Sequence, residues 1–237
     1  QYPGGVAFDA NGDMWVSTDH ADSLKMFTLA QRNGSSTITA PTRSIISPSL
    51  SSPQMLTFDS HGNLWVADEN NGLLEFTAAQ LASASSTPVN AAVILTDTEP
   101  PSAGTYAIVF DAAGNAWVGE NNSDNIVEYT VAQLAASGSP DVHVRLGVDQ
   151  AALDRVAGGA GDARAGARAD VVGFGVLVQP INDPDALAFD SHGNLWVGNY
   201  RNENVIAYAP SQLLTSGNPT PTITISIPGS DPFGLAF

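Results

Sequence analysis

The sequence predicts an all-β protein, a β-propeller made of four-stranded antiparallel blades. Three observations lead to this fold class. An eleven-residue motif occurs four times without gaps, at 6–16, 56–66, 108–118 and 187–197. All four tryptophans of the chain, at 15, 65, 117 and 196, occupy the same position of that motif. The motif returns at a spacing close to 50 residues, which is the period of a propeller blade.

Each repeat starts with an apolar run that ends in phenylalanine, and we expect this run to be the first strand of a blade. The repeated phenylalanines are at 8, 58, 110, 189 and 237, and we expect them in the core. An Asp-x-x-Gly-Asn turn follows, in which the aspartate accepts backbone N–H groups and glycine supplies a positive φ. The turn leads into a Leu-Trp-Val second strand. We therefore interpret the repeated aspartates and glycines as structural.

The second half of each repeat supplies two further strands, joined by a short Ala-Gln-Leu segment of about one helical turn. Both strands have apolar residues on both faces, which indicates burial on both faces between neighbouring sheets. The third strands are expected at 24–27, 73–76, 126–129 and 205–208, and the fourth strands at 43–46, 92–95, 142–146 and 222–227.

The repeats define the domain organisation, a single propeller domain over 1–237. Blades are expected at about 4–52, 53–104, 105–182 and 183–230, and 231–237 would be the first strand of a fifth. The spacing of 79 residues in the third repeat marks an insertion at 147–180, where 12 of the residues 151–170 are alanine or glycine. Two interpretations of this segment stay open: a flexible surface insertion, or a stretch translated out of frame.

The composition excludes several classes of function. With 24 acidic and 8 basic residues, the net charge is -16, which argues against nucleic acids and anionic membrane surfaces as partners. The absence of cysteine excludes disulfides, thiolate catalysis and thiolate metal sites. No apolar run approaches the ~20 residues of a membrane helix, so we expect no membrane insertion. Little lysine and much Ser, Thr, Asn and Gly favour a bacterial extracellular, periplasmic or cell-envelope location.

The pattern Pro-x-x-Leu-x-Phe-Asp-x-x-Gly-Asn-Leu-Trp-Val, complete at 184–197, resembles NHL-type repeats. More loosely, it resembles gluconolactonase-like and virginiamycin B lyase propellers. The resemblance implies closure with six or seven blades, so the four repeats could be part of a six-bladed ring. It also implies that the loops after the second strands surround one mouth of the central channel. Gluconolactonase-like enzymes hold a metal there, and the repeat occurs in binding modules and enzymes alike.

Twelve of the 24 acidic residues fall in loops at this expected mouth, where an acidic rim would attract cations. Carboxylate and amide oxygens suit Ca²⁺ or Mg²⁺, although Asp and Asn also simply favour turns. Aromatic side chains at a mouth can stack on a ligand. The candidate metal ligands are Asp19, Asp68, Glu69, Glu120, Asn121 and Asn199, and the candidate ligand-binding residues are Tyr106, Tyr200 and Arg201.

We expect a non-enzymatic scaffold that binds a protein or a small molecule through its acidic mouth. The chain has none of the nucleophile, zinc-binding or phosphate-binding motifs of the common enzyme classes. Two alternatives stay open. One is a divalent-metal-dependent lactonase or lyase, and the other is an incomplete propeller completed by homo-oligomerisation through an unpaired edge.

Overall fold

The computed structural model describes residues 2–19, 21–34, 37–38, 40–83, 88–97, 104–147 and 179–237. It contains four separate four-stranded antiparallel sheets, each formed by consecutive strands in chain order. The predicted insertion at 147–180 lies almost wholly outside the described residues.

The first two sheets form blades 1 and 2. Blade 1 consists of β1 (Tyr2–Phe8), β2 (Met14–Asp19), β3 (Ser23–Phe27) and β4 (Arg43–Ile46). Blade 2 consists of β5 (Pro53–Phe58), β6 (Leu64–Asp68), β7 (Gly72–Phe76) and β8 (Val93–Leu95).

The other two sheets form blades 3 and 4. Blade 3 consists of β9 (Thr105–Phe110), β10 (Ala116–Glu120), β11 (Asn125–Tyr129) and β12 (Val144–Gly147). Blade 4 consists of β13 (Pro184–Phe189), β14 (Leu195–Asn199), β15 (Asn204–Tyr208) and β16 (Ile223–Ser226). Every third and fourth strand lies within two residues of its predicted range.

The predicted helical turn between third and fourth strands is present in every blade. It is an α-helix in blades 1 and 2, and a single 3₁₀ turn in blades 3 and 4. These elements are α1 (Leu29–Gly34), α2 (Ala78–Ser83), η1 (Gln133–Ala135) and η2 (Pro210–Gln212).

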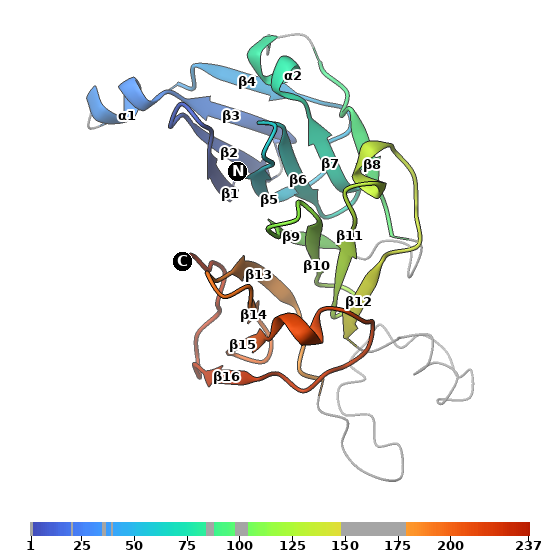
Figure 1. Ribbon diagram of the computed structural model, residues 1–237. Helices are drawn as coiled ribbons and strands as arrows, with labels where there is room; N and C mark the ends of the chain where they lie inside the picture. Colours follow the sequence, from blue (N-terminus) through green and yellow to red (C-terminus); the bar gives the residue numbers. More distant parts are fainter. Residues whose placement is uncertain are drawn as a thin grey trace, which may run out of the picture.

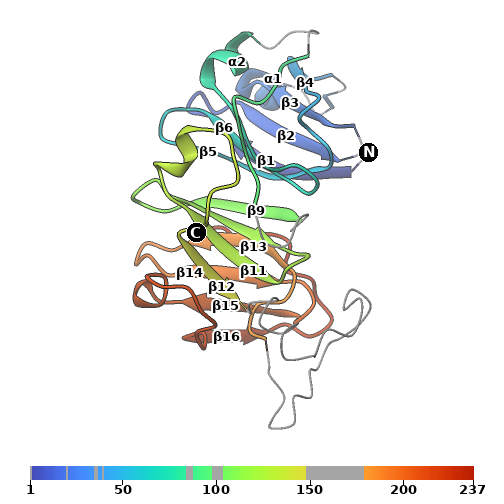
Figure 2. The ribbon, with the colours of Figure 1, turned by 90° about the vertical axis from the view of Figure 1, so that its right-hand side faces the viewer.

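The sheets are arranged as an arc around their first strands (Figures 1 and 2). The strand β1 packs on β5, β5 on β9, and β9 on β13. The arc remains open between blades 1 and 4, and the two chain ends lie on either side of this gap (Figure 1). The described residues thus form part of a propeller, with every first strand facing a common axis.

The core lies between successive blades, as expected for sheets that are apolar on both faces. All five residues of β6, β10 and β11 are buried. At two interfaces the tryptophan of one blade meets the phenylalanine of the next edge-to-face, with ring centroids 6.1 Å apart for Trp65–Phe110 and 6.2 Å apart for Trp117–Phe189. Aromatic pairs prefer this geometry, which explains why both residues recur together.

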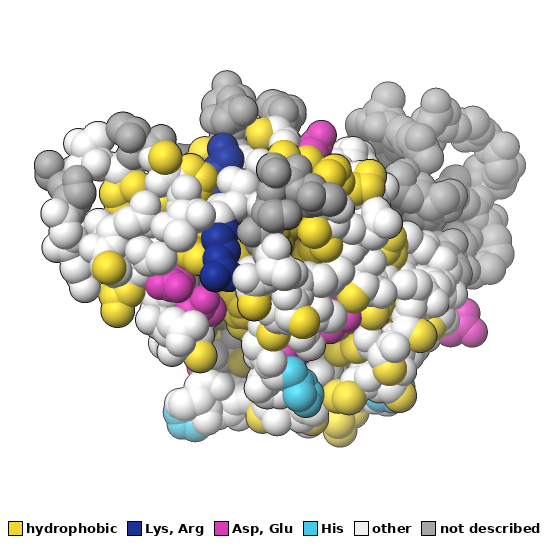
Figure 3. Space-filling view, turned by 90° about the horizontal axis from the view of Figure 1, so that it is seen from above, with side chains coloured by type: hydrophobic (Ala, Val, Ile, Leu, Met, Phe, Trp, Pro, Cys, Tyr) yellow, Lys and Arg dark blue, Asp and Glu magenta, His cyan; other side chains and the backbone are white. Residues whose placement is uncertain are grey.

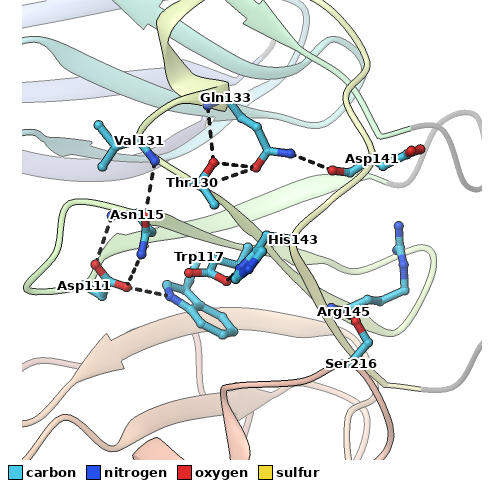
Figure 4. A network of polar contacts seen from close by, with 11 residues as sticks. Asp111, Asn115, Trp117, Thr130, Val131, Gln133, Asp141, His143, Arg145 and Ser216 are labelled. Atoms are coloured by element: carbon cyan, nitrogen blue, oxygen red, sulfur yellow. Dashed lines mark hydrogen bonds and ion pairs between the residues drawn. The ribbon is translucent and has the colours of Figure 1, made fainter.

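The repeated aspartate holds its turn as predicted, and it also bonds to the tryptophan. Asp111 accepts the backbone N–H groups of Ala113 and Asn115 at 2.9 Å, and its second oxygen accepts Trp117 Nε1–H at 3.3 Å (Figure 4). The turns at Asp9, Asp59 and Asp190 have the same bonds. The aspartate and the tryptophan therefore form one structural unit in each blade.

The repeated phenylalanines do not all lie in the core, and this corrects the sequence-based expectation. Phe8 is 54% exposed and Phe237 is 74% exposed. Among the described residues, no sheet packs on the Phe8 side of blade 1, and no strand pairs with residues 231–237. Residues 231–237 reach the face of blade 4, where Phe237 lies 5.6 Å from Trp196, but they form no regular strand because they lack a pairing partner.

The outer edge of blades 1 and 2 carries few charged side chains. Figure 3, which views the molecule from above Figure 1, shows scattered hydrophobic atoms, one small group of Lys and Arg, and few acidic residues. This agrees with a charged fraction of only 14%.

Candidate functional site

The structure places an axial pocket at the centre of the arc, with a cavity volume of about 270 Å³. All four first strands and the C-terminal segment contribute to its wall, through Gly4, Gln54, Tyr106, Asp185 and Phe233. These five residues hold the same repeat position, directly after Pro3, Pro53, Thr105, Pro184 and Pro232. The second strands end close to this pocket, and we call this end of the molecule the mouth.

The six predicted metal ligands belong to two repeat positions, three and four residues after the tryptophan. Because successive strand residues point to opposite faces, the two positions point in different directions. Asp68, Glu120 and Asn199 are at most 1% exposed, whereas Asp19, Glu69 and Asn121 are half-buried. The structure therefore divides the six residues into a buried set and a mouth set.

The buried set makes bonds within and between blades. Asp68 accepts the backbone N–H groups of Ser51, Asn70 and Asn71 at 2.7, 3.2 and 3.0 Å. Burial raises the pKa of Asp68 to about 6 in spite of these three bonds. Its geometry is that of a turn-forming residue.

Glu120 and Asn199 complete the buried set. The Glu120 carboxylate accepts a hydrogen bond from Arg145 Nη1 at 3.3 Å, and Arg145 also forms an ion pair with Asp97 of the preceding blade. Burial, and next the charge of Asp97, hold the pKa of Glu120 well above its usual value. Asn199 donates to the Pro180 carbonyl and to Asn204 Oδ1 at 2.9 and 2.8 Å. These contacts tie neighbouring segments together.

The mouth set centres on Ser52, whose hydroxyl lies 2.9 Å from both Asp19 Oδ1 and Glu69 Oε2. Gln54 Nε2 donates to the same hydroxyl at 3.0 Å, and Tyr106 donates its hydroxyl to Glu69 Oε2 at 3.3 Å. Burial, and then the nearby Glu69 charge, raise the pKa of Tyr106 to about 12, so that it stays a hydrogen-bond donor at neutral pH.

Asp185 is the most unusual residue of the pocket. It is 6% exposed, and its Oδ1 atom is buried without a hydrogen-bond partner among the described residues. Burial, followed by the charges of Asp183 and Asp231, raises its pKa to about 7. A buried acceptor that finds no donor costs about 1–3 kcal/mol, and such perturbed groups concentrate at functional sites.

The three predicted ligand-binding residues lie around this pocket in different roles. Tyr106 lines it directly. The ring of Tyr200 lies 5.4 Å from the ring of Phe233, which is a wall residue. Arg201 is 47% exposed at its side chain and pairs with Asp183. Arg201 thus neutralises a neighbour of Asp185 and does not itself line the pocket.

Several further mouth acids act as turn residues. Asp22, Asp124 and Glu203 adopt positive φ angles of 44°, 56° and 50° in the turns between second and third strands. Asp22 and Asp124 also each accept the backbone N–H of the following blade's first loop, from Ser52 at 3.1 Å and Asp183 at 2.8 Å. The alternative interpretation, that acids favour these turns for structural reasons, holds for these residues.

Asp185 and Phe233 belong to the loops expected at the mouth, but they and Gln54 were not predicted as one pocket. A signal for the pocket was present in the repeats. At this position the blades carry glycine, glutamine, tyrosine, aspartate and phenylalanine, whereas the preceding position is proline in four of the five cases. A position that varies within an otherwise regular repeat is one that the fold does not determine.

In the part of the chain that the structure describes, no three His, Asp or Glu side chains form a group able to hold a metal ion. In the same residues, no helix has the length and apolarity needed to cross a bilayer.

Comparison with solved structures identifies the fold. The chain is similar to virginiamycin B lyase from Staphylococcus aureus, with a TM-score of 0.55 and 16% identity over 96% of this chain and 56% of the lyase. A streptogramin B lyase structure matches at a TM-score of 0.55 and 13% identity, over 95% of this chain and 55% of the other. The chain thus spans just over half the length of these lyases.

An extracellular domain of another bacterial protein has a similar fold. The extracellular domain of a putative one-component system from B. thetaiotaomicron matches at a TM-score of 0.57 and 17% identity, over 98% of this chain and 24% of the other. No family model and no curated protein match the sequence. The fold is therefore a β-propeller, and at these identities the likeness concerns the fold alone.

Proposed function

We propose that the protein is a binding scaffold that takes a ligand at the axial pocket of its acidic mouth. The observation that carries this proposal is Asp185, which lines a cavity of about 270 Å³ together with two aromatic residues and whose buried Oδ1 atom has no hydrogen-bond partner among the described residues. Small-molecule sites combine an apolar cavity with a few convergent polar groups, and this pocket has both features.

The blades hold the residues of the pocket in fixed positions before a ligand binds. The four first strands supply most of the wall, and each strand is fixed by its own sheet and by one or two neighbouring blades. Sites built on such elements are preorganised, so that little conformational entropy is lost when a ligand binds.

A pocket-filling variant tests the proposal. We would screen a chemically diverse fragment set by saturation-transfer NMR against the wild-type protein and against Gln54→Trp. Fragments that bind the wild type should lose binding in Gln54→Trp and keep it in Leu214→Trp, since Leu214 is an outer residue that is already 72% exposed. Binding that Gln54→Trp leaves unchanged, or a wild type that binds no fragment, would contradict the proposal.

A second candidate function is assembly with another copy, and the open end of blade 1 favours it. Val6 and Phe8 are 51% and 54% exposed, whereas the residues equivalent to Val6 in blades 2, 3 and 4 (Leu56, Ile108 and Leu187) are 6%, 7% and 8% exposed. Arg32 lies 4.8 Å over the Phe8 ring and covers it only in part. The exposed face of blade 1 is therefore one side of a blade-to-blade interface, of the kind that buries the equivalent residues of blades 2, 3 and 4.

The other half of such an interface lies on the opposite end of the molecule, on the Trp196 face of blade 4. Contacts between two different faces are head-to-tail, and they close into a ring or extend into a filament. Sedimentation velocity should show association that Phe8→Asp abolishes and Leu214→Asp does not. A monomer at all concentrations would exclude this candidate.

We further propose that the protein acts outside the cytoplasm of a bacterium. The composition supports this location, and so does the fold that the chain shares with the extracellular domain of a putative one-component system. Cell fractionation with an antibody against the chain should detect it in the periplasmic, envelope or medium fraction, and detection in the cytoplasmic fraction alone would contradict the proposal.

A further inference from the structure

The axial pocket is lined by a carboxylate that lacks a full set of donors. Asp185 lines the pocket, and its Oδ1 atom is buried without a hydrogen-bond partner among the described residues. An unpaired buried acceptor is stabilised by any group that brings a donor to it. The ligand that best completes this pocket therefore carries N–H or O–H groups.

The charge around the pocket determines which donors are favoured. The carboxylates of Asp183 and Asp231 act on Asp185, and Glu69 lies against the Tyr106 hydroxyl on the same wall. No lysine or arginine is among the described residues that line the pocket, and the nearby Arg201 is paired with Asp183. The negative potential that these carboxylates create repels anions and attracts cations.

The walls exclude a bare metal ion as the preferred cation. Calcium takes six to eight oxygen ligands, whereas this pocket offers one carboxylate next to the rings of Tyr106 and Phe233. Aromatic faces stabilise organic cations and pack against apolar stems. The ring of Tyr200, 5.4 Å from that of Phe233, holds this second wall in place.

We infer that the axial pocket binds a small organic cation, a primary ammonium group on an apolar or aromatic stem. The ammonium donates to the carboxylate of Asp185, and the stem lies against Tyr106 and Phe233. The cavity of about 270 Å³ limits the ligand to the size of one ring with a short chain. This inference rests on the proposed function and names the class of ligand for the same site.

A matched pair of probes tests it. Phenethylammonium and 2-phenylethanol have nearly the same size and shape, and they differ in charge and in the number of donors. In calorimetric titrations at pH 7.5, we expect the ammonium to bind at least tenfold more tightly than the alcohol. Asp185→Asn should lower the affinity for the ammonium at least tenfold, whereas Asp141→Asn, at an exposed outer position, should leave it unchanged. Circular dichroism of each variant would confirm that the sheets are intact.

The outcomes separate this inference from the proposed function. If the alcohol binds as tightly as the ammonium, the pocket is a ligand site and the cation assignment is wrong. If the wild type binds neither probe at 10 mM, the ammonium assignment is wrong, and the fragment screen with Gln54→Trp still decides the proposed function. If Asp185→Asn and Asp141→Asn bind the ammonium equally, Asp185 is not its partner, which also overturns the inference.

Discussion

The variant Asp185→Asn removes a buried carboxylate from the axial pocket and should make the protein more stable at alkaline pH. Burial raises the pKa of Asp185 from 3.8 to about 7. The folded state therefore binds more protons than the unfolded state between pH 4 and 7. The burial cost consequently grows as the pH rises through this window, is complete above pH 7, and is absent below about pH 4.

The size of the effect follows from this shift. One pKa unit corresponds to about 1.4 kcal/mol, so a shift of this size gives an upper bound of about 4 kcal/mol at pH 8. The pocket opens to solvent, which screens the charge, and we expect roughly half of this bound, about 2 kcal/mol. At pH 5 the unfolded chain is still largely ionised and the folded residue is protonated, so less than half of the gain should remain.

Urea unfolding of the wild type and of Asp185→Asn at pH 5 and pH 8 measures this difference directly. Asp141→Asn is the matched control, because Asp141 is exposed on the outer edge of blade 3. The reasoning is refuted if Asp185→Asn changes the free energy of unfolding equally at both pH values, or if it is less stable than the wild type at pH 8.

Three further predictions concern the turns, the blade interfaces and metal binding. Asp59→Ala should lower the free energy of unfolding by about 1–2 kcal/mol, because Asp59 accepts bonds from Asn63 and Trp65, and His61→Ala in the same turn should have little effect. Burial alone would raise the pKa of Asp59, but these bonds outweigh it and lower the pKa, so the contribution of Asp59 should disappear as the pH falls below 4. Gly119→Ala should destabilise the protein by about 2 kcal/mol in the same assay, because a Cβ atom would lie 2.6 Å from the Pro184 carbonyl oxygen, whereas Gly34→Ala meets no atom within 4 Å and should be neutral. In calorimetry, any Ca²⁺ binding should be lost in Glu69→Gln and kept in Glu120→Gln, and the reverse result would point to the buried set as the metal site.

The repeats contain enough information to predict the fold almost completely. The four tryptophans, the Asp-x-x-Gly-Asn turns and the strands apolar on both faces predicted blades, and the repeats locate every third and fourth strand within two residues of its position. The exposure of Phe8 could not be predicted in the same way. A repeated residue is buried only when both neighbouring blades are present, and this condition is not visible within one repeat.

The site was predictable only in part. Residue type and loop position placed Asp68 and Asp19 in one candidate metal set, but the alternation of side chains along a strand separates them. The role of Asp185 could not be predicted for a different reason. Its Oδ1 atom lacks a hydrogen-bond donor, and whether an oxygen is left without a donor depends on the packing of four first strands that are distant in sequence.

A carboxyl-carbon NMR titration of Asp185, with and without phenethylammonium, tests the central claim most directly. The groups that face Asp185 are Asp183, which is paired with Arg201, together with Asp231 and the wall residue Tyr106 near Glu69. For a buried carboxylate at a cation site, we expect a midpoint near pH 7 in the free protein and a lower midpoint when the ammonium is bound. A midpoint near 4 that the ammonium does not move would contradict the account.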